Sequence, residues 1–147
     1  MELTWHYGGF ADLAAVTVYR LLELRSRVFV VEQNCVYNDM DGLDLGADHL
    51  WAQDAARIVA ALRVLPAGVK YPEIAIGRVV VDADYRKHGL GRELMTRALA
   101  RTGGHATRVQ AQAYLEKFYA SLGYRSIGAQ YEEDGILHVD MVRPAGS

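Results

Sequence analysis

The chain has 147 residues, and it contains only one cysteine, three prolines and no long apolar run. Cys35 has no second cysteine with which to form an internal disulfide, which fits a reducing compartment. Apolar runs such as 28–31 and 58–62 are much shorter than the ~20 residues of a membrane helix, and the first residues do not have the pattern of a signal peptide. We therefore expect a soluble, cytoplasmic protein that has no membrane partner.

The chain also has little net charge. Its formal charge of -2 argues against the basic surface that binds nucleic-acid phosphates, so no nucleic-acid partner is expected. The five histidines show no metal-ligand spacing, and the acidic stretch around Gly42 fails the calcium-loop pattern, so no metal is expected. With 51% hydrophobic and 23% charged residues, the whole chain, 1–147, is expected to fold as one domain.

Hydrophobic periodicity predicts strands that alternate with helices. Strands are expected over residues 2–7, 49–53, 58–65, 73–81 and 107–112, followed by two closing strands near 124–131 and 136–142. One long helix is expected over 13–28, a second ends before Gly103, and a third covers 113–122. Residues 32–48 are expected to form an extended loop. This order predicts an α/β fold with a mixed central sheet of about six to seven strands flanked by helices.

A loop with two glycines joins the Ile/Val-rich strand to the second helix. Glycines let the backbone turn tightly and approach a ligand, and free N–H groups at a helix start favour anions. Between positions 86 and 108 there are six basic residues and one acidic residue. The loop is therefore a candidate pyrophosphate cradle; the alternative is a plain strand-to-helix turn, with Arg97 and Arg101 on a solvated helix face. The loop consists of Arg86, Lys87, His88, Gly89, Leu90 and Gly91.

This Arg-x-x-Gly-x-Gly sequence after a strand resembles the acetyl-CoA motif of the GNAT superfamily of N-acetyltransferases. The resemblance implies a GNAT fold and acetyl-CoA as cosubstrate. In that family the strand contacts the pantetheine arm, and the loop amides hold the pyrophosphate. The residues that it assigns to acetyl-CoA are Val79, Val80, Val81, Arg86, Lys87, His88, Gly89, Leu90, Gly91 and Arg92.

A second motif begins within the expected third helix. The sequence Phe118-Tyr119-Ala-Ser-Leu-Gly123-Tyr124 resembles the aromatic pair, Gly and aromatic of the same family, and the family's catalytic tyrosine falls on Tyr119. A phenol hydroxyl there can protonate the departing CoA thiolate as general acid. Without the resemblance, a packed helix tyrosine is the simpler interpretation. The family's pantetheine-contacting asparagine corresponds to Gln112.

The loop over 32–48 carries five acidic residues and no Lys or Arg. An acidic lip of this kind can attract a cationic amine, and one carboxylate can relay its proton through water. The alternative is a solvated turn rich in Asp and Gly. Glu32, Glu132 and a water chain remain open as the general base.

Further segments, among them Asp39-Met40-Asp41-Gly42 and the stretch Tyr131 to Ile136, resemble the ElaA-like branch of GNAT. Arg25 with Phe29 and Asp41 with Asp44 also resemble the N-terminal pattern of acyl-homoserine lactone synthases, which implies an acceptor pocket that includes Arg25, Phe29 and Asp41. The expected function is direct acetyl transfer to a small-molecule or peptide amine. A non-catalytic acyl-CoA-binding or sensory module is the alternative, and an exposed final strand would allow a homodimer.

Overall fold

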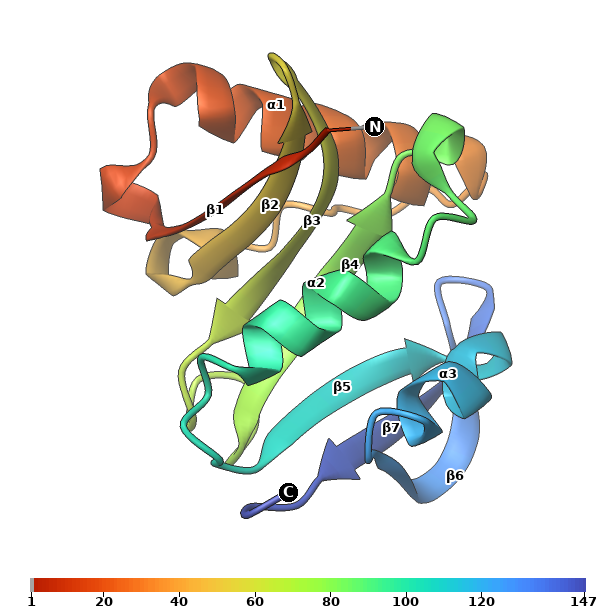
Figure 1. The fold of residues 1–147 in the computed structure, drawn as a ribbon. Coiled ribbons are helices and arrows are strands. Elements are labelled where there is room, and N and C mark those ends of the chain that lie inside the picture. Colours follow the sequence, from red (N-terminus) through yellow and green to blue (C-terminus); the bar gives the residue numbers. More distant parts are fainter. Residues whose placement is uncertain (1) are drawn as a thin grey trace.

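A computed structural model of the chain describes residues 2–147 (Figure 1). Within these residues, seven strands form one mixed sheet in the order β1-β2-β3-β4-β5-β7-β6. All neighbouring pairs are antiparallel except β4 and β5, which run parallel. The predicted α/β class and the size of the sheet are confirmed. The strands are β1 Thr4–Gly9, β2 Asp48–Asp54, β3 Arg57–Leu65, β4 Ile74–Val81, β5 Thr107–Gln112, β6 Arg125–Glu133 and β7 Ile136–Arg143.

The helices match the predicted positions but not all of the predicted lengths. α1 covers Ala15–Arg25 and continues directly as a π-helical segment, Ser26–Glu32, so the helical region extends beyond residue 28 and the loop begins later. α2 covers Leu90–Leu99. The third predicted helix is shorter than expected, because Ala113–Leu115 forms a 3-10 turn and only Glu116–Ala120 forms α3.

Helices cover both faces of the sheet, as Figure 1 shows for α1 behind the strands and α2 in front of them. The side chains that α2 buries follow its predicted apolar stripe: Leu90, Leu94, Met95 and Ala98. They pack against one face of the sheet, together with Val79 and Val81 of β4. The neighbouring Val80 points to the opposite face and packs with α1 and the π-helical segment. The alternation along β4 thus separates two hydrophobic layers.

β4 and β5 are paired only at their beginnings. The parallel register contains Ile74 with Thr107 and Ala75 with Arg108, after which the strands diverge (Figure 1). The pairing of β4 with β3 also shifts register between Ala61 and Arg63, and Arg78 has a φ of 52° there. A bulge of this kind bends the strand. The sheet therefore opens between β4 and β5, and within the described residues the edge of β4 that faces β5 has no strand partner beyond Ala75.

The edge strands of the sheet are β1 and β6. The expectation of an exposed final strand is wrong, because β7 pairs with β5 on one side and with β6 on the other. Any dimer formed through a sheet edge would have to use β1 or β6. Among residues 2–147, no helix is long and apolar enough to cross a membrane.

Candidate active site

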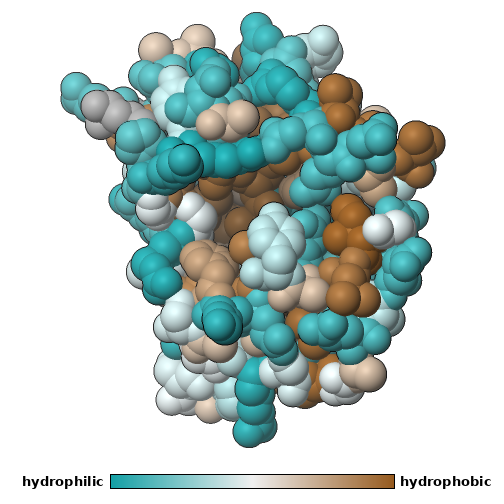
Figure 2. Space-filling model, turned by 90° about the vertical axis from the view of Figure 1, so that its right-hand side faces the viewer, coloured by the Kyte–Doolittle hydropathy of each residue, from teal (hydrophilic) through white to brown (hydrophobic). Residues whose placement is uncertain are grey.

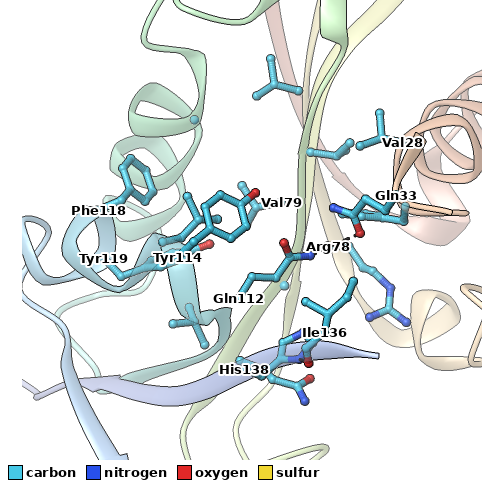
Figure 3. A pocket seen from close by; sticks show the side chains of 18 of the residues that line it. Val28, Gln33, Arg78, Val79, Gln112, Tyr114, Phe118, Tyr119, Ile136 and His138 are labelled. Atoms are coloured by element: carbon cyan, nitrogen blue, oxygen red, sulfur yellow. Dashed lines mark hydrogen bonds between the residues drawn. The ribbon is translucent and has the colours of Figure 1, made fainter. Parts of the chain in front are cut away.

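A pocket of about 570 Å³ occupies the opening between β4 and β5. Figure 2 shows it as a hollow with an apolar interior below a hydrophilic rim. Its walls come from the π-helical segment, β4, the loop before α2, β5, α3 and the β6–β7 hairpin. In Figure 3, Phe118 and Tyr119 lie on one side of the pocket, Val28 and Gln33 on the other, and Ile136 and His138 below. The pocket therefore connects the two faces of the sheet.

The loop before α2 forms one end of the pocket. Gly89 is the N-cap of α2 with φ 74° and ψ 17°, a conformation that L side chains rarely adopt, and a Cβ there would meet no atom within 4 Å. The first N–H groups of a helix have no partner within it, so those of Leu90 and Gly91 are available for a ligand. Lys87 and Arg92 also line this end, which suits an anion. His88, in contrast, is exposed and lies outside the lining.

Fewer basic side chains line the end of the pocket near this loop than the sequence predicts. Arg97 and Arg101 lie over the rings of Trp5 and Tyr7, with guanidinium carbons 4.3 and 3.9 Å from the ring centroids. Arg108 forms an ion pair with Asp140 at 2.5 Å. The basic residues that line the pocket near the loop are Arg86, Lys87 and Arg92.

Arg86 links the two sides of the pocket. Its guanidinium forms a two-pronged ion pair with Glu32, at 2.5 and 2.9 Å, and its Nε donates to the carbonyl oxygen of Val81 at 3.2 Å. The hydrogen bond from Arg86 lowers the pKa of Glu32, against a smaller effect of burial. Glu32 does line the pocket, but this arrangement makes it a weak base.

The predicted strand residues and Gln112 also lie at the pocket. Val79, Val80 and Val81 line it where β4 has left β5. Gln112 at the end of β5 donates a hydrogen bond from Nε2 to Gln33 Oε1 at 3.4 Å, across the opening. The residues expected to contact a pantetheine arm thus lie together.

Tyr119 lies on α3 and is 5% exposed, and it lines the pocket. The rings of Phe118 and Tyr124 meet its ring edge-on, with centroids 5.1 and 5.8 Å away. Burial raises the pKa of Tyr119, and the nearby Tyr124 and Tyr114 add to this effect. The phenol is therefore protonated at neutral pH, which is the state that a general acid needs.

The acidic loop does not provide an open acidic lip, because arginines neutralise its carboxylates. Arg25, which is 3% exposed, forms ion pairs with Asp39 at 2.8 Å and with Asp44 at 2.6 Å. Arg63, which is 2% exposed, binds Asp41 at 2.7 Å. The hydrogen bond from Arg63 holds the pKa of Asp41 well below its usual range.

This cluster corrects two of the predicted acceptor residues. Arg25 and Asp41 do not line the pocket, since their charged groups are bound to the cluster, whereas Phe29 does line it. Arg78 connects the cluster to the pocket: it lies in the bulge of β4, lines the pocket and forms an ion pair with Asp39 at 2.8 Å. The cluster therefore holds the wall of the pocket rather than its ligand.

Glu132 is also misplaced as a base. In the β6–β7 hairpin, Glu132 pairs with Leu137, while Glu133 pairs with Ile136 and Tyr131 with His138. Paired residues share a face and successive residues alternate, so Glu132 points away from the face that carries Ile136 and His138. Glu133 lines the pocket and accepts a hydrogen bond from Gln110 at 2.6 Å.

Several residues of the pocket were not predicted. Cys35 is buried, and its Sγ donates to the carbonyl oxygen of Asp134 at 3.2 Å, which joins the loop to the hairpin. The alternation of β5 and β7 was a signal that could have identified Gln110, Ile136 and His138, once the two strands were known to be neighbours. The unpredicted lining residues include Cys35, Arg78, Gln110, Ile136 and His138.

Comparison with known proteins agrees with this geometry. The family model described as an acetyltransferase (GNAT) domain matches residues 15–144. The protein ElaA of Escherichia coli is 37% identical over 147 residues, which cover 96% of this chain and 96% of ElaA. The crystal structure of an acyl-CoA N-acyltransferase from Pseudomonas aeruginosa matches with a TM-score of 0.90 and 38% identity, over 97% of this chain and 99% of that one.

The acyl-homoserine lactone synthase LasI shares the fold alone, with a TM-score of 0.78 and 15% identity over 96% of this chain and 89% of that one. The relatives at higher identity match almost end to end and include ElaA itself. The chain therefore belongs to the GNAT family of acyltransferases, in its ElaA-like branch, a family that uses an acyl-CoA cosubstrate.

Proposed function

We propose that the protein is an N-acetyltransferase that transfers acetyl from acetyl-CoA directly to an amine, with Tyr119 as general acid. One observation carries this proposal: a single pocket joins the N-terminus of α2, the opening between β4 and β5, and the buried Tyr119. The acceptor that we propose is a small-molecule or peptide amine.

The residues present fit acetyl-CoA. The open space at Gly89, the first amides of α2 and the cations Lys87 and Arg92 suit a pyrophosphate. The free backbone edge of β4 beside Val79 can bind the amide groups of a pantetheine arm, as strand edges bind extended chains. Gln112 adds a side-chain amide on the opposite strand.

In the proposed step, the lone pair of the amine attacks the acetyl carbonyl carbon. A C–N bond forms, the C–S bond breaks, and the electron pair of that bond leaves on the CoA sulfur. Tyr119 donates its proton to that sulfur, and a base takes one proton from the amine nitrogen. The two proton transfers balance, so the products are an amide and a free thiol.

Titration calorimetry with acetyl-CoA, followed by thiol release across a panel of amines, amino acids, polyamines and peptides, tests the proposal. We expect acetyl-CoA to bind and at least one amine to stimulate thiol release. No binding at millimolar acetyl-CoA would contradict it. Binding without release for any amine would favour the non-catalytic module instead.

The role of Tyr119 has its own test. Tyr119→Phe should bind acetyl-CoA as the wild type does, while kcat falls by about 10²-fold, the lower end of the range for general acid–base catalysis. Tyr19→Phe, on the exposed surface of α1, is the matched control and should change neither quantity. Unchanged turnover in Tyr119→Phe would remove this residue from the mechanism.

A further inference from the structure

We propose that His138 is the general base that takes the proton from the acceptor amine. This inference rests on the proposed function, because it requires an amine acceptor in the pocket. None of the sequence motifs points to His138. The evidence is its position, the hydrogen bond of its ring and its relation to Tyr119.

His138 lines the pocket from the side of the β6–β7 hairpin. It belongs to β7, where it pairs with Gln112 of β5 and with Tyr131 of β6, and it lines the pocket. Figure 3 shows it on β7 beside Ile136, below Gln112. Since Gln112 is at the end of β5 that borders the opening, His138 lies on the pocket side of this sheet region.

The hydrogen bond of the ring determines which nitrogen is basic. Nδ1 of His138 is 2.7 Å from the carbonyl oxygen of Ile136. A carbonyl oxygen only accepts hydrogen bonds, so Nδ1 carries the hydrogen, and in the neutral ring Nε2 then holds a free lone pair. The ring of Tyr131 stacks on the imidazole with centroids 6.1 Å apart and planes 23° apart. The Ile136 carbonyl oxygen and the Tyr131 ring thus together fix the orientation of the imidazole and of its Nε2.

The proposed base and the proposed acid come from opposite faces of the sheet. Tyr119 packs with the core layer that includes α2, Val109 and Val139. In β5 and β7, Gln112 and His138 are the neighbours of buried Ala111 and Val139, so alternation puts them on the other face. A thioester in the opening between β4 and β5 can therefore meet an amine and its base from one face, while its sulfur meets Tyr119 from the other.

Two carboxylates of the pocket, Glu32 and Glu133, are less suitable. Glu32 is bound by Arg86 through two hydrogen bonds, which lowers its pKa. Glu133 accepts a hydrogen bond from Gln110 at 2.6 Å. The neutral ring of His138 instead holds a lone pair on Nε2 that can accept a proton. The titratable or charged groups that share this face or line the same pocket are Glu32, Cys35, Tyr37, Arg78, Arg86, Lys87, Arg92, Arg108, Tyr114, Tyr119, Arg125, Tyr131, Glu133, Asp134 and Asp140.

The first experiment measures the tautomer of His138 in the free protein. Long-range ¹H–¹⁵N correlation spectra at pH 8, with the His138 signals assigned by their loss in His138→Asn, should show hydrogen on Nδ1 and a bare Nε2. Hydrogen on Nε2, or on both nitrogens at this pH, would overturn the proposal. This measurement needs no acceptor, so it is decided separately from the proposed function.

The second experiment measures the pH dependence of kcat/KM with an amine that the acceptor panel identifies. His138→Asn can retain a donor toward Ile136, so it removes the base with little change to the strand. We expect kcat/KM to fall by about 10²-fold at pH 8 and its acidic limb to disappear. His105→Asn, an exposed histidine outside the pocket, is the matched control and should keep the wild-type profile.

The outcomes separate the two proposals. A wild-type rate and acidic limb in His138→Asn would overturn the role of His138 and leave the N-acetyltransferase proposal intact. If the wild type transfers acetyl to no amine of the panel, the proposed function fails, and with it the role of His138 in amine deprotonation. Partial recovery of His138→Ala by added imidazole would support a base over a merely structural residue.

Discussion

The two charged segments of the chain differ in what their charges do. The basic loop before α2 opens into the pocket, with Lys87 and Arg92 in its lining and the helix amides free. The acidic loop that follows the π-helical segment binds arginines within the same domain, and Arg25 and Arg63 are almost completely buried against it. One segment presents its charge to the pocket, while the other uses its charge to hold the protein together.

This difference shows that a run of like charge does not identify a binding surface. Five acidic residues without Lys or Arg predicted an acidic surface that attracts a cationic amine. The arginines that bind Asp39, Asp41 and Asp44 come from α1, β3 and β4, which are distant in sequence and adjacent only in the fold. Variants in the two segments distinguish charges that stabilise the fold from charges that serve the pocket.

The largest effect is expected from breaking the arginine cluster. Arg25→Met removes one of the two arginines that bind each of Asp39 and Asp44, and removing one member of a buried ion pair costs about 3–5 kcal/mol of unfolding free energy. Urea denaturation measures this loss. Arg20→Met on the same helix breaks an exposed pair with Glu23 and is expected to cost less than about 1 kcal/mol. Equal losses in the two variants would show that the cluster is not structural.

Acid should weaken the same cluster. The hydrogen bond from Arg63 lowers the pKa of Asp41, and Arg25 and Arg63 lower the pKa of Asp44 although its burial alone would raise it. Groups with lowered pKa stabilise the fold fully above their unfolded pKa of about 4 and lose that stabilisation as the pH falls toward the folded value. We expect Tm to fall steeply below about pH 4.

The matched measurement is the same titration of Arg25→Met, which lacks one of the two arginines. Its Tm should depend less on pH in this range. Arg25 no longer lowers the pKa of Asp44 in this variant, so protonation of Asp44 removes less stabilisation. Parallel curves for the two proteins would assign the acid sensitivity to carboxylates elsewhere.

At the basic loop, Gly89→Ala tests the anion site. A side chain at φ 74° costs about 1–2 kcal/mol of stability, and relief by backbone movement would misplace the amides of α2. We expect the Kd for acetyl-CoA, measured by calorimetry, to rise by at least about tenfold, or ~1.4 kcal/mol. Gly46→Ala, where a Cβ also meets nothing within 4 Å but φ is not positive, should leave the Kd unchanged. An unchanged Kd in Gly89→Ala would argue against the cradle.

The smallest effect is expected from Glu32→Gln, which breaks the exposed ion pair with Arg86. Stability should change by less than about 1 kcal/mol. Because Arg86 makes Glu32 a weak base, kcat should fall by less than about tenfold in thiol-release assays, well short of the 10²-fold expected for a general base. A loss of about 10²-fold would restore Glu32 as the general base.

The success of the sequence-based predictions depended on how local their signals were. The apolar stripe of α2 and the tight glycine turn at its start are properties of a few adjacent residues, and the structure has both. The π-helical ending of the first helix and the shortness of α3 were missed, because tertiary packing overrides helix propensity there. Glu132 was chosen over Glu133 because only the hairpin register decides which of two neighbours faces the pocket.

By itself, the sequence determined the GNAT motifs, the α/β order of the elements and the location of the two-glycine loop at the start of α2. The tertiary structure decided which charges are neutralised, where β4 leaves β5, and that His138 faces the pocket opposite Tyr119. The physical reason is the range of the interactions. Turns and helix periodicity follow from neighbouring residues, whereas strand register and ion pairs depend on groups that only the folded chain brings together.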